Sequence, residues 1–248
     1  MLPPRTLAAL TRAQAVGIRI VLATGRMFRS VLPYARQAAI ETPLVCYQGA
    51  AVVDPVTAEW LLHEPIPLEL AREAMAAVEE TGFTLNCYVD DELYVAEVTE
   101  HARAYADFQH LPLTAVGSLL GWLERPPTKL VVVNDPHALD ELRPRLVERF
   151  GDRLFIAKSL PYFLELANPR ISKGSGLAFV AEHLGFAAAE TVAFGDGEND
   201  LELLDWAGFA VCVENGHDLL KARADWICPG PSEEGVAQAI EAFLDSGS

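Results

Sequence analysis

Residues 191–200 read TVAFGDGEND, an apolar run that passes directly into a cluster of glycines and acids. The apolar half is typical of a buried strand, and open parallel sheets bind their ligands just beyond the carboxyl ends of such strands. Mg²⁺ takes oxygen ligands and needs only one or two carboxylates besides water and phosphate. Asp196 is placed to supply one of them, and Asp200 follows one helical turn later and points back to the same spot.

The same acids also have a purely structural explanation. Asp196 suits the capping position of the helix that follows, and Glu198 and Asp200 suit the positive N-terminus of that helix. We assign Glu198 to this structural role. For Asp196 and Asp200, the stretch taken alone leaves a metal site and a helix end equally open.

On both sides of this stretch, helices alternate with short apolar strands. The expected helices cover 5–16, about 28 onward, 174–185, 199–207, 216–223 and 233–245, and the expected strands cover 18–24, 43–47, 191–195, 209–213 and 225–228, with a hairpin over 49–62. The alternation predicts an α/β fold, a Rossmann-like parallel sheet covered by helices in three α/β/α layers. The run IRIVLAT at 18–24 is almost wholly apolar, so we expect a strand that is buried on both faces.

The middle of the chain interrupts that alternation. Helices are expected from 67 to 82, up to about 108 and before Gly151, and strands over 83–89, 92–96, 128–134, 153–157 and 162–166. These elements carry apolar faces of their own, and both ends of the segment return near the first sheet. We therefore predict an inserted α+β domain at 65–165, within a discontinuous core domain made of 1–64 and 166–248.

The composition excludes several classes of protein. The 248 residues carry a net charge of −16 with only 19 Lys and Arg, which speaks against a nucleic-acid partner because phosphate neutralisation needs clustered basic residues. No apolar run approaches membrane-spanning length and no signal pattern is visible, so we expect a cytoplasmic protein without membrane contact. The four cysteines lie far apart without a Cys-x-x-Cys pair, which argues against a zinc ribbon or a redox motif. The oligomeric state is not readable from the sequence.

Two more strand ends carry candidate binding residues. Thr24, Gly25 and Arg26 end the expected strand at 18–24, and Gln48 and Gly49 end the next one. The Thr24 hydroxyl and the backbone N–H groups after it suit a phosphoryl oxygen, because glycine lets the backbone approach an anion. A turn that merely requires glycine is the alternative explanation.

Lys173 stands at the start of the helix that re-enters the core, in NPRISKG at 168–174. A lysine at a helix N-terminus opposes the helix dipole, so the position is a poor one for stability. It suits a cation that neutralises a phosphate or that pairs with Asp200. A solvated surface lysine is the alternative.

Taken in order, these motifs resemble the haloacid dehalogenase superfamily of phosphohydrolases, and within it the Cof-like subgroup with an α/β cap. IVLATGR resembles the second motif of the family, SKG its third and GDGENDLELL its fourth. The segments TPLVCYQGA and DWICPGPSEEGVAQAI are also similar to that subgroup. The resemblance therefore covers nearly the whole chain.

The resemblance implies a phosphate-binding role for five residues. Thr24 would bind the transferring phosphoryl group, together with the neighbouring Gly25 and Arg26. Lys173 would stabilise the charge of that group, and Asn199 would orient both Lys173 and the phosphate. Phosphoryl transfer depends mainly on positioning and charge neutralisation, which agrees with these assignments.

The resemblance also implies a cofactor and a substrate class. Mg²⁺ would be ligated by Asp196 and supported through water by Asp200, so that Thr24, Lys173 and Asp200 form the implied catalytic set. The substrate would be a small phosphorylated metabolite, with sugar phosphates as the default. The inserted domain would act as the cap that selects it.

One part of the family pattern is missing. The first motif, Asp-x-Asp-Gly-Thr, supplies the nucleophilic aspartate and the general acid/base from a central strand, yet no Asp in this sequence stands in Asp-x-Asp-Gly. The chain begins MLPPRTLAAL, which resembles the helix that follows that strand in the family. We therefore expect the natural reading frame to start further upstream, and this chain to be inactive or impaired.

Two other functions compete with this one. A catalytically inactive relative on the same scaffold would still bind phosphate esters or act as a regulator, and the sequence does not separate it from the enzyme. An unrelated nucleotide-binding α/β domain is disfavoured because the chain has neither a Gly-x-Gly-x-x-Gly turn nor a Walker lysine motif.

Overall fold

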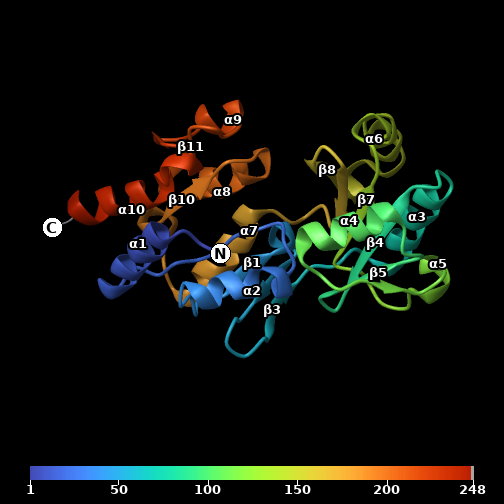
Figure 1. Cartoon of the computed structure of the whole chain (residues 1–248), viewed down its shortest axis with the longest axis horizontal. Coiled ribbons are helices and arrows are strands. Elements are labelled where there is room, and N and C mark those ends of the chain that lie inside the picture. The colour runs from blue at the N-terminus through green and yellow to red at the C-terminus, as the bar shows by residue number, and fades with distance from the viewer. Residues whose placement is uncertain (247–248) are drawn as a thin grey trace. The chain divides into compact units, whose positions relative to one another are not determined.

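The computed structural model describes residues 1–246 and divides into two compact units. We call Met1–Leu62, together with the chain from Ser172 onward, the core unit, and His63–Ile171 the inserted unit (Figure 1). The sequence placed the two junctions near 64 and 166. No helix within residues 1–246 has the length and apolar character needed to cross a membrane.

The core unit alternates helices and strands along the sequence. Its helices are α1 (Pro4–Ala15), α2 (Phe28–Gln37), α7 (Lys173–Leu184), α8 (Leu201–Trp206), α9 (Asp218–Lys221) and α10 (Gly235–Ser246). Its strands are β1 (Leu44–Cys46), β2 (Ala51–Val53), β3 (Trp60–His63), β10 (Val192–Gly195), β11 (Phe209–Val213) and β12 (Trp226–Cys228). Short 3₁₀ turns stand at η1 (Tyr47–Gly49), η3 (Ala188–Glu190), η4 (Glu198–Asp200) and η5 (Pro231–Glu233).

These strands form two sheets. β10, β11 and β12 are parallel, and their register sets Phe194 opposite Val211 and Val211 opposite Trp226. β1, β2 and β3 form the second sheet, in which β1 and β2 are antiparallel with Val45 opposite Val52. The predicted parallel sheet is therefore present.

The parallel sheet is covered by helices on both faces. Ala193 and Cys212 point to one face and pack with leucines of α7, α8 and α9, namely Leu177, Leu203, Leu204 and Leu220. Val211 and Val213 point to the other face and pack with Ala239 and Phe243 of α10. Successive side chains of a strand alternate between faces, so each strand needs apolar residues on both sides. The three-layer α/β/α prediction is confirmed.

The segment 18–24 departs from the prediction. It lies extended beside β1, where the Thr24 N–H donates to the Val45 carbonyl at 2.8 Å and the Val45 N–H donates to the Leu22 carbonyl at 2.9 Å. Only Ala23 forms a ladder bridge, to Val45, and Ile18 is 47% exposed. The prediction of a strand buried on both faces was wrong, since none of residues 18–24 is buried and no second strand among residues 1–246 pairs with the segment.

The inserted unit is built on one six-stranded sheet with the order β6-β5-β4-β7-β9-β8. Its strands are β4 (Thr84–Val89), β5 (Glu92–Val95), β6 (Thr114–Ala115), β7 (Lys129–Val133), β8 (Phe155–Leu160) and β9 (Phe163–Ala167), its helices are α3 (Leu68–Glu79), α4 (Glu100–Gln109), α5 (Leu119–Trp122) and α6 (Pro136–Phe150), and its 3₁₀ turn is η2 (Gly151–Arg153). The sequence did not predict β6 or α5. Both are too short to show a hydrophobic period.

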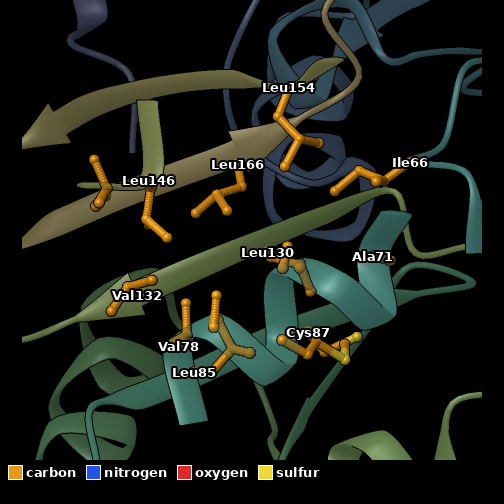
Figure 2. Packing of buried hydrophobic residues seen from close by; sticks show 14 of the residues in the cluster. Ile66, Ala71, Val78, Leu85, Cys87, Leu130, Val132, Leu146, Leu154 and Leu166 are labelled. Carbon is orange, nitrogen blue, oxygen red and sulfur yellow. The ribbon is translucent and has the colours of Figure 1, made fainter. Parts of the chain in front are cut away.

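One face of this sheet carries the apolar core of the inserted unit (Figure 2). Leu85 and Cys87 of β4 lie beside Leu130 and Val132 of β7, and helices α3 and α6 cover them. The opposite face is more polar. There Lys129 and Glu165 form a buried ion pair with 3.3 Å between Nζ and Oε1.

The polar face also contains an unsatisfied amide. Asn86 of β4 is fully buried, and neither its Nδ2 nor its Oδ1 has a hydrogen-bond partner among residues 1–246. Asn168, also in the inserted unit, is nearly as buried, but its Nδ2 donates to the Pro65 carbonyl at 3.1 Å. A buried polar group without a partner costs about 1–3 kcal/mol.

In the core unit, the turn η1 is unusual in its backbone. Tyr47, Gln48 and Gly49 have φ values of 52°, 61° and 100°, so three consecutive residues are left-handed. At Gly49, a Cβ would lie 2.0 Å from the carbonyl oxygen of Ser172, the residue that precedes α7. Only glycine therefore allows η1 to approach the start of α7 this closely.

The close approach of Gly49 to Ser172 predicts that alanine destabilises the protein more at position 49 than at position 17. Gly17 also has a positive φ, of 89°, but a Cβ there meets nothing within 4 Å. We expect Gly17→Ala to lower the free energy of unfolding by about 1 kcal/mol, the cost of a left-handed alanine. Gly49→Ala adds a steric clash and should cost about 1–3 kcal/mol more in urea unfolding. Equal losses at the two positions would contradict the contact.

The two buried asparagines predict opposite changes in the free energy of unfolding when each is replaced by leucine. Asn86→Leu removes an amide without partners and should raise the free energy of unfolding by about 1 kcal/mol. Asn168→Leu removes an amide that bonds to Pro65 and should lower it by a similar amount. The midpoints of urea unfolding measure both effects. A loss of stability in Asn86→Leu would mean that this amide does have a partner in solution.

Candidate active site

The site is organised by a buried ion pair between two residues that the sequence singled out. Lys173 Nζ lies 2.6 Å from Asp200 Oδ1, and the side chains are 9% and 4% exposed. Lys173 is the first residue of α7, whose start is fixed by a capping box in which Ser172 and Ser175 bond to each other's backbone. The prediction named pairing with Asp200 as one of two uses for this lysine. The structure shows that pairing.

The second oxygen of Asp200 fixes the turn after β10. Asp200 Oδ2 accepts the backbone N–H groups of Asp196 and Gly197, each at 3.0 Å. With Lys173 on Oδ1, both carboxylate oxygens of Asp200 have partners inside the protein. Gly195 allows this arrangement, because a Cβ there would lie 2.7 Å from the Cβ of Asp200.

Asp196 is left with its side chain exposed. Its backbone is held at both polar atoms, since its N–H donates to Asp200 and its carbonyl accepts the His217 N–H at 2.8 Å. A carboxylate that is exposed on a fixed backbone is free to take a cation or solvent. The turn therefore presents one acid outward and keeps the other inside.

Gln48, in the left-handed turn η1, bonds both to the end of the segment 18–24 and to the turn after β10. Its side chain is buried, and its Oε1 accepts Asn199 Nδ2 at 2.9 Å. Its backbone N–H donates to the Thr24 carbonyl at 3.0 Å. A Cβ on Gly25 would lie 2.4 Å from Gln48 Nε2, so the side chain of Gln48 fills the space beside Gly25.

The sequence singled out Gln48 only as a strand-end residue and gave it no role in binding phosphate or metal. The one available signal was its place at the end of a strand, next to a glycine. A left-handed glutamine cannot be recognised from residue type, because glycine, asparagine and aspartate are the residues that favour this conformation.

Thr24 and Arg26 form a tight turn of their own. The Arg26 N–H donates to Thr24 Oγ1 at 3.1 Å, and Arg26 Nη1 donates to Ser30 Oγ at 3.4 Å. Because the Thr24 hydroxyl accepts this bond, its own O–H is available as a donor to another group. Through Gln48 and Asn199, this turn connects to the pair of Lys173 and Asp200, so the core unit brings all the predicted site residues into one connected group.

The metal-binding potential of this group rests on few ligands. Within residues 1–246, no three His, Cys, Asp or Glu side chains gather closely enough to hold a metal ion. Asp196 offers an exposed carboxylate, whereas Asp200 is already bonded to Lys173 and two N–H groups. Mg²⁺ is often held by one carboxylate with water and a substrate phosphate, and this donor set fits it in that form.

Comparisons with known proteins show the family of the chain. The sequence pattern of the haloacid dehalogenase-like hydrolases matches residues 1–240. The chain is 27% identical over 251 residues to pyridoxal phosphate phosphatase of Escherichia coli, covering 97% of this chain and 92% of the relative. It is 29% identical over 252 residues to HMP-PP phosphatase of Cronobacter sakazakii, covering 97% and 88%. It is 27% identical over 249 residues to 5-amino-6-(5-phospho-D-ribitylamino)uracil phosphatase of Bacillus subtilis, covering 96% and 90%.

Solved structures agree with the sequence comparison. A haloacid dehalogenase-like hydrolase from Bacteroides thetaiotaomicron superposes with a TM-score of 0.90 at 26% identity, covering 98% of this chain and 93% of that one. A protein from Thermotoga maritima superposes with a TM-score of 0.87 at 29% identity, covering 97% and 90%. The family pattern runs through both units and the fold matches over nearly the whole chain. The chain therefore belongs to the haloacid dehalogenase-like hydrolases.

Proposed function

We propose that this chain provides the phosphate site and the cap of a Mg²⁺-dependent phosphohydrolase for small phosphorylated metabolites. The observation that carries the proposal is the buried Lys173 ammonium, held by Asp200 beside the turn that exposes Asp196. The names of the relatives support it, since they are phosphatases of pyridoxal phosphate and of other small phosphorylated compounds.

The phosphoryl group would be held by three kinds of contact. Lys173 would neutralise its charge in surroundings of low dielectric, where such an interaction is stronger than in water. Thr24 would donate its O–H to a phosphoryl oxygen, and the backbone at Gly25 and Arg26 would approach another. Asn199, one amide hydrogen of which is committed to Gln48, would orient the group with the other. These residues bind and position rather than react.

The proposed cofactor would sit at the exposed acid. Asp196 would hold Mg²⁺ directly, and Asp200 would reach it only through water, because its own oxygens are occupied. When bound, the ion supplies positive charge beside the phosphoryl oxygens and the leaving group. Asp200 would meanwhile hold the turn and the Lys173 ammonium in place.

In this proposal the nucleophile would be a carboxylate other than Asp200. The sequence contains no Asp-x-Asp-Gly motif, and Asp200 has both oxygens bonded within the site. We propose that a further parallel strand carries the nucleophilic aspartate and pairs between the segment 18–24 and β10. In support, β10 is an edge strand, and Val21 and Ala23 pack in the same apolar cluster as Ala193 of β10. Such a strand would end beside Thr24 and Asp196.

The inserted unit is proposed to act as the cap. Its independent sheet and apolar core make it a separate compact body, as expected for a cap that selects substrates and excludes water during the reaction. Sugar-phosphate-like compounds remain the default substrate class. A cytoplasmic location likewise stays a prediction from the sequence.

A second candidate function follows from the missing motif. Without an aspartate nucleophile, the same residues would bind phosphate esters and not hydrolyse them. Lys173, Thr24 and Asn199 would have the same contacts in both cases, so binding alone does not separate the two functions. Hydrolysis does.

The proposal is tested by hydrolysis of p-nitrophenyl phosphate with and without Mg²⁺. The assay compares the 248-residue chain with the same chain extended by a strand ending in Asp-x-Asp-Gly-Thr. We expect hydrolysis only by the extended chain and only with Mg²⁺. In that chain, Asp196→Asn should lower kcat/KM about 10²–10³-fold through lost charge stabilisation.

Glu198→Gln is the matched control, because Glu198 is an exposed acid of the same turn to which we assign no part in binding or catalysis. It should leave kcat/KM within about twofold, as expected for a surface substitution. Hydrolysis by the chain without the extra strand, abolished by Asp196→Asn, would overturn the proposed source of the nucleophile. Phosphate binding without hydrolysis by either form would favour the second candidate function.

A further inference from the structure

The turn η1 places a strained, buried glutamine at the centre of the phosphate site. Tyr47 and Gln48 are both left-handed, with φ values of 52° and 61°, and neither is a residue type that favours this conformation. Such strain persists only where the surrounding structure fixes it, and it gathers at functional sites. Tyr47 is fully buried and Gln48 is 6% exposed, so the turn is packed on all sides.

The strained backbone delivers the Gln48 side chain between two phosphate-site elements. Its Oε1 accepts Asn199 Nδ2 at 2.9 Å, its backbone N–H holds the Thr24 carbonyl at 3.0 Å, and its amide fills the space where Gly25 lacks a side chain. Gln48 thus bonds to the Thr24 turn through its backbone and to Asn199 through its side chain. One residue thus joins the two elements.

We infer that Gln48 is a positioning residue for phosphate, which holds the amide of Asn199 and the turn at Thr24 and Gly25 in a fixed relation. This inference rests on the proposed function, because it assigns Asn199 and Thr24 to the phosphoryl group. Gln48 acts through Asn199. Its loss would leave the Asn199 amide free to rotate and would loosen the backbone at Gly25, so that fewer donors face the anion.

Gln48→Met tests the inference, because methionine has nearly the length of glutamine but accepts no comparable hydrogen bond. Binding of inorganic phosphate with Mg²⁺ is measured by titration calorimetry for Gln48→Met, Asn199→Ala and the double variant. Affinity should fall about tenfold in each single variant, as for the loss of one well-placed hydrogen bond to a charged group. The double variant should be no weaker than the weaker single variant, because the two residues act as one unit.

Gln14→Met is the matched control, since Gln14 also makes a side-chain hydrogen bond, in which its Nε2 donates to the Ala39 carbonyl at 3.0 Å. It should leave phosphate affinity unchanged. A merely structural role for Gln48 would lower the urea midpoint and leave phosphate affinity intact. Full additivity of the two affinity losses would also overturn the inference.

A second readout separates this inference from the proposed function. In the absence of phosphate, the side-chain amide signals of Asn199 in a nitrogen–proton NMR spectrum should shift in Gln48→Met and remain in place in Gln14→Met. If the unmodified chain binds no phosphate, the proposed function fails. The spectrum then tests by itself whether Gln48 positions Asn199. Unshifted Asn199 signals would overturn the inference whether or not phosphate binds.

Discussion

The buried ion pair between Lys173 and Asp200 is the interaction on which the rest of the core site depends. Moving an ammonium and a carboxylate out of water costs several kcal/mol per ion, and their attraction offsets this only when the remaining hydrogen bonds are satisfied. Here Asp200 accepts Lys173 on one oxygen and two backbone N–H groups on the other. The pair therefore joins the start of α7 to the end of β10, and it leaves Asp196 as the acid that faces outward.

Close backbone approach is what makes this pair possible. A Cβ at Gly195 would collide with Asp200, and one at Gly174 would lie 2.4 Å from the carbonyl oxygen of Glu202 in α8. Gly49 plays the same part where η1 meets Ser172. The glycines of the recognisable motifs thus act less as flexible links than as places where one segment can lie against another. Because of them, the segments that carry the charged groups can lie close together.

The sequence reveals those features of the site that are local. Asp196, Lys173 and Thr24 could be singled out because each follows or begins an apolar element, and the three-layer core followed from the alternation of such elements. The Lys173 and Asp200 pairing was one of two stated possibilities. The role of Gln48 could not be recognised, since it depends on a left-handed backbone and on contacts with segments far away in the chain. The segment 18–24 was misjudged because a strand also needs partners, which its own composition does not reveal.

A double-mutant cycle on Lys173 and Asp200 tests the central role of the ion pair most directly. The free energy of unfolding would be measured in urea for Lys173→Met, Asp200→Leu and the double variant. Each single variant leaves an uncompensated buried charge and should lose about 3–5 kcal/mol, while the double variant should lose no more than Asp200→Leu alone. Losses that simply add would show that the two side chains do not depend on each other, and would contradict the organisation of the site around this pair.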